Sequence, residues 1–447
     1  MKHRFVLAGV AVLLLCAASQ PTTFGAKRAA AEDTAASGAS GTSNEEIYKQ
    51  LELFEHALAI VRSDYVEEPQ AKPLVYGALK GMLATLDPYS QFLDPDSYAE
   101  LKVETEGEFG GLGIEITIKD DLLTIITPID DTPASQAGLM AGDRIVKIDG
   151  ELTRGLTLVD AVKKLRGKPK TKVTLTVLRE GENALKEVVL ERAIIKIQSV
   201  RESTMLDEHI GYVRLSDFRE KTTEDLEAAL KKLKEQAMDS MVLDLRNNPG
   251  GLLDQAISVS ELFLKRRQLI VTTKGRLRNQ NQEVHSRIDG MVSDLPLVIL
   301  INEGSASASE IVAGAMQDHH RAVLLGTKSH GKASVQTIFP LKDGSALRLT
   351  TSKYFTPSGR SIHGQGIPPD VEVPFERPPA EDKDKPAKGE QAAEIFEKVE
   401  SGEKLNEKSP ESTTAKNNKK RKDNQLARAV DLLKGIKVYQ TKEKTGS

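Results

Sequence analysis

The sequence contains one cysteine, Cys16, and no tryptophan in 447 residues, and aromatic side chains make up only 4% of it. Because Cys16 lies in an apolar N-terminal stretch, the rest of the chain can hold no disulfide, thiolate zinc site or cysteine nucleophile. Its 62 basic and 65 acidic side chains leave a net charge of −3. The chain therefore lacks both the positive charge and the stacking rings that favour nucleic-acid binding. We expect a globular protein whose chemistry uses oxygen, nitrogen or backbone groups, with no nucleic-acid partner.

No apolar run has the length of an ordinary membrane-spanning helix. Residues 5–18 form an apolar stretch of 14 residues after a basic start, whereas a spanning helix needs about 20. This layout is typical of a secretory signal. We expect residues 1–26 to be a signal peptide or an N-terminal anchor. The protein would then be exported, to the periplasm or another extracytoplasmic space, with or without an inner-membrane tether. Residues 27–44 contain no core-forming side chain, which predicts a low-complexity tether.

The other end of the chain is dominated by charge. Residues 376–422 contain 12 basic and 11 acidic side chains but only four of Ile, Leu, Phe and Val. Such a composition cannot bury enough apolar area to offset the entropy lost on ordering, so we expect a charged disordered tail. The apolar spacing in residues 424–433 indicates a short amphipathic helix, which would lie in the C-terminal segment 423–447.

The remaining chain divides into three blocks by hydrophobic periodicity. Helical spacing in residues 45–86 predicts an N-terminal helical region over 45–100. The next block alternates apolar and polar residues and predicts a small β-rich module with helices at 134–139 and 158–165. The third block predicts an α/β layered domain, with buried strands at 210–215, 241–245, 295–301 and 322–325. Thr222 and Asp225 indicate a capping box at the start of one of its helices.

The β-rich block resembles a PDZ domain. The resemblance rests on Phe-Gly-Gly-Leu-Gly-Ile at 109–114 and on the stretch PASQAGLMAGDRIVKIDG at 133–150. Glycines allow successive N–H groups to turn toward one anion, and an adjoining edge strand can accept an extended peptide. The expected carboxylate-binding loop consists of Gly110, Gly111, Leu112, Gly113 and Ile114. The alternative is that these glycines only form a turn or a bulge.

Arg166 follows the second helix of this block. It could reach a bound carboxylate, but a basic residue there more often stabilises the helix C-terminus. We favour that structural role.

Two strand-to-helix junctions in the third block could carry chemistry. The stretch DLRNNPGGLL at 244–253 presents backbone N–H groups near a helix start, although an ordinary turn would have the same sequence. In the second junction, Ser307 and Glu310 form a capping box, and a serine at a helix start is usually only a cap. A serine becomes a nucleophile when a base removes its proton. A buried lysine with a lowered pKa can be that base, and residues 326–336 supply two lysines and a glutamine.

Residues 75–375 resemble the carboxyl-terminal processing peptidases, or tail-specific proteases. The ordered motifs are LDPYSQFL at 86–93, the PDZ-like block, GSASASE around Ser307 and GxKxxGKxxVQ at 326–336. The resemblance implies a multidomain fold of α/β and α+β type. It would comprise the N-terminal helical segment, a PDZ domain at 101–185 and a crotonase/Clp-protease-like α/β peptidase core at 186–375.

The resemblance also implies residue roles. Ser307 would be the nucleophile, Lys332 the general base, and Gln336 would orient the lysine. The oxyanion hole would use backbone N–H groups of Ala308 and of Gly250 or Gly251. No metal and no cofactor would be required. His330 and Ala333 replace an aromatic residue and a glycine that are common in the motif, which affects loop geometry and removes no catalytic group.

These observations predict an exported serine endopeptidase that binds protein C-terminal tails through its PDZ domain and cleaves by a Ser-Lys dyad through an acyl-enzyme. Its expected partners are polypeptides with unstructured C-termini, a regulatory or adaptor protein, and a second copy of the chain. Membrane contact would involve only the N-terminal segment. Two alternatives stay open at this point. One is a Ser-His-Asp protease, although no histidine lies in a recognised base motif. The other is a PDZ scaffold without catalysis. The absence of HExxH leaves a metalloprotease unsupported.

Overall fold

The structure is a computed structural model that describes residues 44–179, 182, 184–376, 395–397, 399 and 423–445. The chain divides into two compact units, residues 1–71 and residues 72–447. The expected signal segment and almost all of the expected tether lie outside the described residues. Within the described ranges, no helix is both long enough and apolar enough to cross a bilayer.

The described part of the first unit is mainly one helix, α1 (Asn44–Asp64). Its apolar side chains Ile47, Leu51 and Phe54 recur at helical spacing and are exposed in the structure. The helical prediction for this stretch is confirmed.

The second unit begins with two helices and a short strand. They are α2 (Ala71–Ala84), β1 (Gln91–Leu93) and α3 (Pro95–Glu106). α3 begins where the Asp94 carboxylate accepts a hydrogen bond from the N–H of Ser97, and it ends at Gly107, whose φ is +72°. β1 pairs with a strand from the far end of the chain, β18 (Ala346–Phe355), so this segment joins the sheet that the later strands form.

The next segment forms a β-rich module around a core of its own. Its elements are β2 (Glu108–Gly111), β3 (Ile114–Lys119), β4 (Leu122–Pro128), α4 (Pro133–Gln136), β5 (Arg144–Ile148), β6 (Glu151–Leu152), α5 (Leu158–Leu165), β7 (Lys172–Leu178), β8 (Lys186–Glu191) and β9 (Ala193–Lys196). The main sheet has the order β3-β4-β5-β7-β8, which leaves β3 at an edge, and β2 pairs separately with β9. Both helices predicted for this block are present, with the second at its predicted bounds and the first ending at Gln136, short of the predicted residue 139.

The third block combines a six-stranded sheet with a smaller sheet. Its elements are β10 (Val200–Met205), η1 (Asp207–His209), β11 (Ile210–Leu215), α6 (Thr222–Glu235), β12 (Ser240–Asp244), α7 (Leu253–Glu261), β13 (Leu269–Gly275), η2 (Arg278–Gln280), β14 (Gln282–His285), β15 (Leu297–Ile301), α8 (Ala308–Asp318), β16 (Val323–Gly326), β17 (Ser334–Pro340), β18, β19 (Val371–Glu372) and α10 (Asn424–Thr445). The larger sheet has the order β10-β11-β12-β15-β16-β19 and is parallel from β11 to β19. The smaller sheet has the order β1-β18-β13-β14, with β17 also paired to β18.

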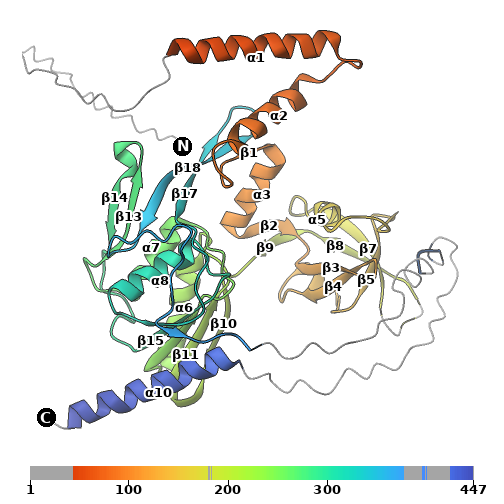
Figure 1. The fold of residues 1–447 in the computed structure, drawn as a ribbon. Helices are drawn as coiled ribbons and strands as arrows, with labels where there is room; N and C mark the ends of the chain where they lie inside the picture. The colour runs from red at the N-terminus through yellow and green to blue at the C-terminus, as the bar shows by residue number, and fades with distance from the viewer. Residues whose placement is uncertain are drawn as a thin grey trace, which may run out of the picture. The chain divides into compact units, whose positions relative to one another are not determined.

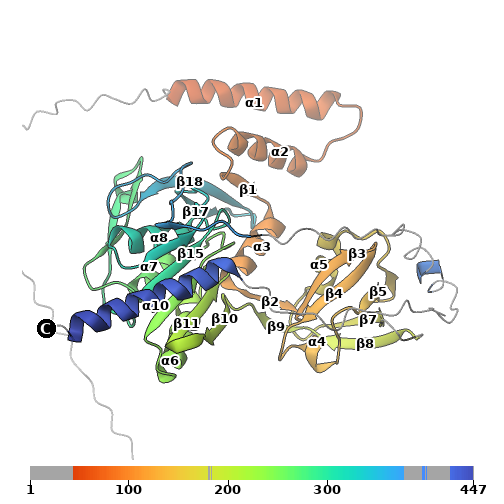
Figure 2. The same ribbon diagram turned by 60° about the horizontal axis from the view of Figure 1, so that its bottom comes forward.

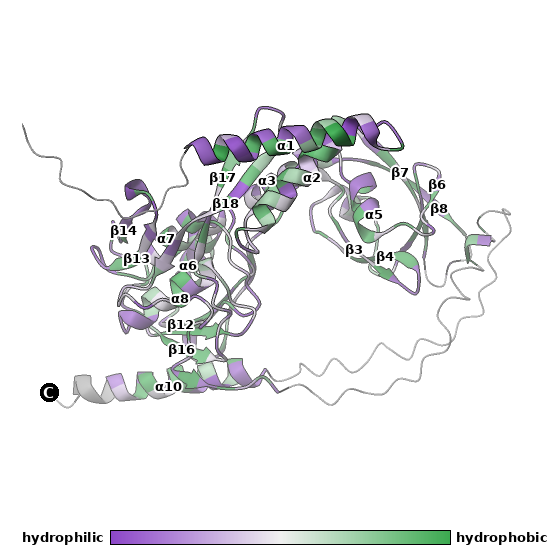
Figure 3. Ribbon diagram, turned by 45° about the horizontal axis from the view of Figure 1, so that its top comes forward, coloured by the Kyte–Doolittle hydropathy of each residue, from purple (hydrophilic) through white to green (hydrophobic). Residues whose placement is uncertain are grey.

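Both faces of the larger sheet are covered. Successive residues of a strand point to opposite faces, so Leu243 joins the core formed with α6, α7 and α8, while Val242 faces α10. α10 contributes Ala429 and Leu433 to the second core, and Figures 1 and 2 show it lying along the sheet. In Figure 3 the inner strands β12 and β16, each paired on both sides, are mainly hydrophobic, as strands buried on both faces require. The predicted α/β layering and its four strands are confirmed.

Two expectations are wrong. The first is the capping box at Thr222. The residue before α6 is Lys221, and the Thr222 hydroxyl accepts a hydrogen bond from the N–H of Arg219 and donates to Ser199 instead of capping the helix. The Thr222 hydroxyl is therefore used by a tight turn and by a neighbouring hydroxyl, and it is not available to cap the helix.

The second is the fully disordered tail. Residues 395–397 and 399 have helical backbone, and Ile395, Phe396 and Val399 are buried against the β-rich module. The average composition of residues 376–422 hides this cluster, because three of its four large apolar residues fall on one helix face. Most of the expected tail lies outside the described residues.

The helix α10 should contribute measurably to folding. Leu433 is fully buried, so Leu433→Ala should lower the free energy of unfolding by about 2–5 kcal/mol through the cavity it leaves. The matched control Val438→Ala, on the exposed face of the same helix, should change it by less than about 0.5 kcal/mol. Chemical denaturation measures both values, and equal effects would contradict the packing of α10 on the sheet.

Candidate active site

The candidate active site lies where two adjacent parallel strands end. β12 is followed by the loop of residues 245–252, and β15 by residues 302–307. Parallel neighbours open their carboxyl ends at the same edge of a sheet, where ligands of α/β proteins usually bind. The two loops lead into α7 and α8, whose first turns present backbone N–H groups.

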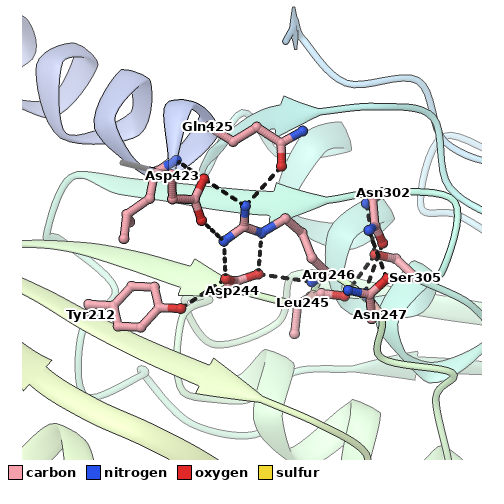
Figure 4. Close-up of polar contacts among 10 residues, drawn as sticks. Tyr212, Asp244, Leu245, Arg246, Asn247, Asn302, Ser305, Asp423 and Gln425 are labelled. Atoms are coloured by element: carbon pink, nitrogen blue, oxygen red, sulfur yellow. Dashed lines mark hydrogen bonds and ion pairs between the residues drawn. The ribbon is translucent and has the colours of Figure 1, made fainter. Parts of the chain in front are cut away.

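Side chains and backbone lock the two loops together, as Figure 4 shows. The N–H of Asn247 donates to Asn302 Oδ1 at 2.8 Å, and Asn302 Nδ2 donates back to Asn247 Oδ1 at 2.9 Å. Ser305 Oγ donates to the carbonyl oxygen of Leu245 at 2.7 Å. Because these bonds cross from one strand end to the other, the position of one loop fixes that of the other.

Gly250 lies in contact with the start of α8. A Cβ atom on Gly250 would lie 2.7 Å from the carbonyl oxygen of Ala306 and 2.8 Å from both the Ala308 nitrogen and the Ser307 Cβ. Its φ of +99° also disfavours a side chain. Only glycine allows this approach, and the structure thus brings Gly250 together with Ser307 and Ala308.

The two glycines differ in what their N–H groups do. The N–H of Gly250 donates to Asn248 Oδ1 at 2.9 Å. The N–H of Phe218 donates to the carbonyl oxygen of Gly250, and the carbonyl oxygen of Phe218 accepts from the N–H of Leu252. Neither bond uses the N–H of Gly251. Among the described residues, the Gly251 N–H therefore has no partner.

Ser307 occupies a strained turn at the start of α8. Its φ of 54° and ψ of −113° are uncommon for a residue with a side chain. Its hydroxyl donates to no group of the described residues. Ala308 is the first residue of α8, so its N–H has no acceptor within the helix. The turn thus combines a half-buried serine hydroxyl with an unused backbone donor.

Glu310 links this turn to the loop of residues 326–333. Its fully buried carboxylate accepts hydrogen bonds from the Ser307 N–H at 2.9 Å, the Ser329 hydroxyl at 2.6 Å, and the N–H groups of Gly331 and Lys332 at 2.7 and 2.9 Å. Only half of the capping box expected of Ser307 and Glu310 forms: the carboxylate accepts from the Ser307 N–H, whereas the Glu310 N–H donates to the Ser307 carbonyl oxygen and not to its hydroxyl. The other three bonds of the carboxylate were not predicted, and they fix the backbone of Ser307 and of Lys332 to one group.

Tyr354 makes a second link between the same two residues. Its buried hydroxyl lies within hydrogen-bond distance of the carbonyl oxygens of Ser307, at 3.0 Å, and of Lys332. Burial raises the pKa of Tyr354 well above its ordinary value, so the phenol keeps its proton.

Lys332 has the electrostatic setting of a lysine that can lose its proton. Burial lowers its pKa, the charge of Arg348 lowers it further, and Glu310 acts in the opposite direction. The ammonium lies over the ring of Tyr89, 4.8 Å from its centre. No hydrogen bond of the described residues joins Lys332 Nζ to Ser307 Oγ.

Gln336 lies on β17, and its hydrogen bonds are made to residues other than Lys332. Its Nε2 donates to Ser334 Oγ at 2.9 Å and contacts Thr350 Oγ1 at 3.3 Å. The Thr350 hydroxyl in turn donates to Asp87. The expected orienting role of Gln336 therefore stays a prediction, and the 86–93 motif supplies the groups next to it.

Hydrogen bonds to its carbonyl groups hold the expected carboxylate-binding loop in place. Gly110 and Gly111 belong to β2, and Ile114 begins β3. The carbonyl of Leu112 accepts from the N–H of Ala134, and that of Gly113, with φ of +77°, accepts from Ile129 and Thr132. The N–H groups of Leu112 and Gly113 donate to no group in the described part of the chain. Nearby, the Arg166 guanidinium lies 4.7 Å from the ring centre of Phe109.

No histidine of the described residues is positioned to act as the base of a Ser-His-Asp mechanism. No described histidine is hydrogen-bonded to Ser307; His330 is exposed, and its backbone N–H bonds to the carbonyl of Ser305. Across the described ranges, no group of three or more His, Cys, Asp or Glu side chains could hold a metal ion.

Three residues of the site were missed in the sequence. Glu310 was assigned only a capping role, Tyr89 lay in a motif with no role, and Tyr354 had no signal. Glu310 in GSASASE and Tyr89 in LDPYSQFL both lie in recognised motifs. Their contacts could not be predicted because the partner residues lie in other segments of the chain.

Three family descriptions match this chain. Peptidase family S41 matches residues 209–373, a PDZ domain matches 124–179, and the N-terminal domain of the activating protease CtpB matches 14–97. They agree with the fold class expected from the sequence, which is confirmed.

Individual relatives point the same way. A carboxy-terminal-processing protease of Bartonella bacilliformis is 48% identical over 337 residues, covering 74% of this chain and 77% of the relative. A carboxyl-terminal-processing protease of Synechocystis is 40% identical over 71% of this chain and 75% of its own length. Among solved structures, the photosystem II D1 C-terminal processing protease is 30% identical over 74% of this chain and 88% of that chain, with a TM-score of 0.43. The two sequence relatives and the family descriptions show that the chain belongs to the carboxyl-terminal-processing serine proteases of Peptidase family S41 and carries a PDZ domain.

Proposed function

We propose that this protein is an exported serine endopeptidase that captures polypeptide C-termini with its PDZ domain and cleaves peptide bonds with a Ser307–Lys332 dyad. The observation that carries the proposal is the Glu310 carboxylate, which binds the N–H of both residues. The serine lies at a strained helix start and the lysine has a lowered pKa. A hydroxyl nucleophile and a desolvated amine base are the two groups that metal-free acyl transfer needs.

The proposed reaction proceeds by acyl transfer. Ser307 Oγ attacks the carbonyl carbon of the scissile amide while Lys332 Nζ takes its proton. The lysine then gives that proton to the leaving amine, and the C–N bond breaks to leave an acyl-enzyme. A water molecule, deprotonated by the same lysine, hydrolyses the ester and restores the Ser307 hydroxyl.

Backbone N–H groups would stabilise the oxyanion. The Ala308 N–H is unused by the helix, and the Gly251 N–H has no described partner. The Gly250 N–H donates to Asn248 in this structure, so of the two glycines Gly251 is the better candidate for the second donor. Donors fixed in place cost no reorganisation when negative charge develops.

The lysine must move to act as the base. Its ammonium lies over Tyr89 and makes no hydrogen bond to Ser307 in this geometry, and catalytic bonds commonly form only once substrate is bound. Gln336 Oε1 has no described partner, and we propose that it accepts a hydrogen bond from Lys332 in the active arrangement.

The PDZ domain offers a matching site for a peptide tail. The N–H groups of Leu112 and Gly113 would bind the terminal carboxylate, and β3 is an edge strand to which an extended peptide can add. Because a peptide must be extended to add to the edge strand β3, we propose substrates with unstructured ends. A regulatory or adaptor protein and a second copy of this chain are further proposed partners. Export, and membrane contact through the N-terminal segment alone, are proposed from the layout of residues 1–26.

The dyad is tested with a serine-directed acylating probe and a peptide substrate. Ser307→Ala and Lys332→Ala should each reduce turnover by a factor on the order of 10³ or more and abolish labelling, while a C-terminal peptide still binds. Lys328→Ala, an exposed lysine in the same loop, is the matched control and should be unchanged. Wild-type turnover in Ser307→Ala would exclude the dyad. A wild-type chain that binds tails without labelling or cleavage would be a scaffold.

The pH dependence tests the lysine as the base. Only neutral Lys332 accepts a proton, so kcat/KM should rise with pH through the lowered pKa of this residue. Arg348→Gln removes a repelling positive charge, which should raise that pKa and move the rising limb to higher pH. Arg348→Lys keeps the charge and should leave the limb near its original position. An unmoved limb in Arg348→Gln would exclude Lys332 as the titrating base.

Glu310 is tested by Glu310→Gln. The amide offers one acceptor oxygen where four donors now converge, and each buried donor left unsatisfied costs about 1–3 kcal/mol. We expect a lower free energy of unfolding and loss of Ser307 labelling even where the variant is folded. Glu303→Gln, in the preceding loop and exposed, should retain both properties. Normal labelling in folded Glu310→Gln would contradict the linking role.

A further inference from the structure

The C-terminal helix begins at the candidate active site. Figure 4 shows the guanidinium of Arg246 between two carboxylates. On one side, Arg246 Nε and Nη2 donate to Asp244 at 2.9 and 2.6 Å. On the other, Nη1 and Nη2 donate to Asp423 at 3.0 and 2.7 Å, and Nη1 also donates to Gln425 at 2.8 Å. The last residue of β12 is thus joined through Arg246 to the residue that precedes α10.

Burial makes this contact strong. The side chain of Arg246 is 11% exposed and that of Asp244 is 1% exposed. Burial opposes the charge of Arg246, but its hydrogen bonds to Asp244 and Asp423 raise the pKa above the ordinary value. Tyr212 also donates to Asp244 at 2.9 Å, so that carboxylate is already well supplied with donors. Asp423 satisfies the outer edge of the guanidinium, and bidentate pairs of this kind fix direction as well as distance.

Arg246 lies in the same loop as the two glycines, four residues before Gly250. The next residue, Asn247, has a φ of 56° and is paired with Asn302. The carbonyl of Asn248 then accepts from the N–H of Ala306 and from Ser309 Oγ. A rotation of the Arg246 backbone would therefore be passed to Gly250 and to the start of α8.

We propose that Asp423 is a positioning residue of the active site, which holds Arg246 so that the loop bearing Gly250 and Gly251 keeps its place beside Ser307. The family match ends at residue 373, and the proposal makes α10 a working part of the protease. It rests on the proposed function, because it assumes that this loop supplies the oxyanion donor.

The role can be separated from the anchoring of α10. The helix is also anchored by its buried residues, by Gln425 Nε2 bonded to the carbonyl of Val373 at 2.7 Å, and by a second ion pair, Lys437 with Asp239 at 2.7 Å. That pair attaches α10 to the start of β12, at the opposite end of the strand from Asp244. Asp239→Asn therefore weakens an α10 contact without touching the loop and is the matched control.

The test is a steady-state comparison on the full chain, with a tail peptide as substrate. Asp423→Asn keeps the oxygen that accepts from the N–H of Leu426 at the helix start, because Asn caps helices as well as Asp does. It removes the negative charge and replaces the oxygen that accepts from Arg246 Nη2 by an amide NH2 group, so the bidentate pair with Arg246 is lost. We expect kcat to fall by about tenfold with KM within about twofold of the original value. The melting temperature of Asp423→Asn should fall further than that of Asp239→Asn, because its ion pair is more buried, but both variants should be folded at the assay temperature, and the kcat of Asp239→Asn stays normal.

Non-additivity provides the second readout. Arg246→Gln should lower kcat at least as much as Asp423→Asn, and the double variant should be no slower than Arg246→Gln alone. A normal kcat in Asp423→Asn, an equal loss in Asp239→Asn, or additive losses in the double variant would overturn the proposal. If Ser307→Ala remained active, the dyad would fall, while the Asp423 and Asp239 variants could still be compared on that activity.

Discussion

The geometry of the candidate active site depends on the hydrogen bonds of the buried Glu310 carboxylate. The carboxylate is fully buried, and its charge is stabilised by four N–H and O–H donors rather than by a salt bridge within the described residues. Two of the donors come from the backbone of Ser307 and Lys332, which are 25 positions apart. A buried charge without such donors would be expensive, so the fold and the site stabilise each other. Tyr354 adds a neutral clamp on the carbonyl groups of the same two residues.

Opposing effects act on the Lys332 amine. Burial and Arg348 favour the neutral form, whereas Glu310 and the face of Tyr89 favour the ammonium. A buried lysine with no neighbouring contact would be neutral, but its amine would have no fixed position. A lysine in a salt bridge with a carboxylate would stay protonated. The observed surroundings lower the pKa of Lys332, and no salt bridge of its amine is present among the described residues. A substrate that draws Nζ away from Tyr89 would remove one stabilising contact of the charged form.

The sequence predicted much of the fold because hydrophobic periodicity is local. Strands such as 210–215 were visible as apolar runs, and both helices of the β-rich module as spaced apolar residues. Ser307 and Lys332 were predicted from motifs. Their connection through Glu310 was not predicted, because α8 and β16 separate the two residues along the chain. Thr222 failed because a local signal lost to a tertiary hydrogen bond with Ser199. In residues 376–422, average composition concealed the cluster at 395–399.

The six-stranded sheet explains why the C-terminal helix belongs to the catalytic unit. Strands that are apolar on both faces need two covers, and α6, α7 and α8 supply only one. The second cover, α10, comes after a long charged segment, so neither sequence continuity nor the family match at 209–373 indicates that it is part of the same domain. Once α10 lies on that face, the residue before it, Asp423, reaches the end of β12, where the chain turns toward Gly250. The packing of α10 on the sheet thereby places Asp423 beside Arg246. The ion pair between these two residues follows from that packing, and through the loop of Arg246 it can affect the position of Gly250.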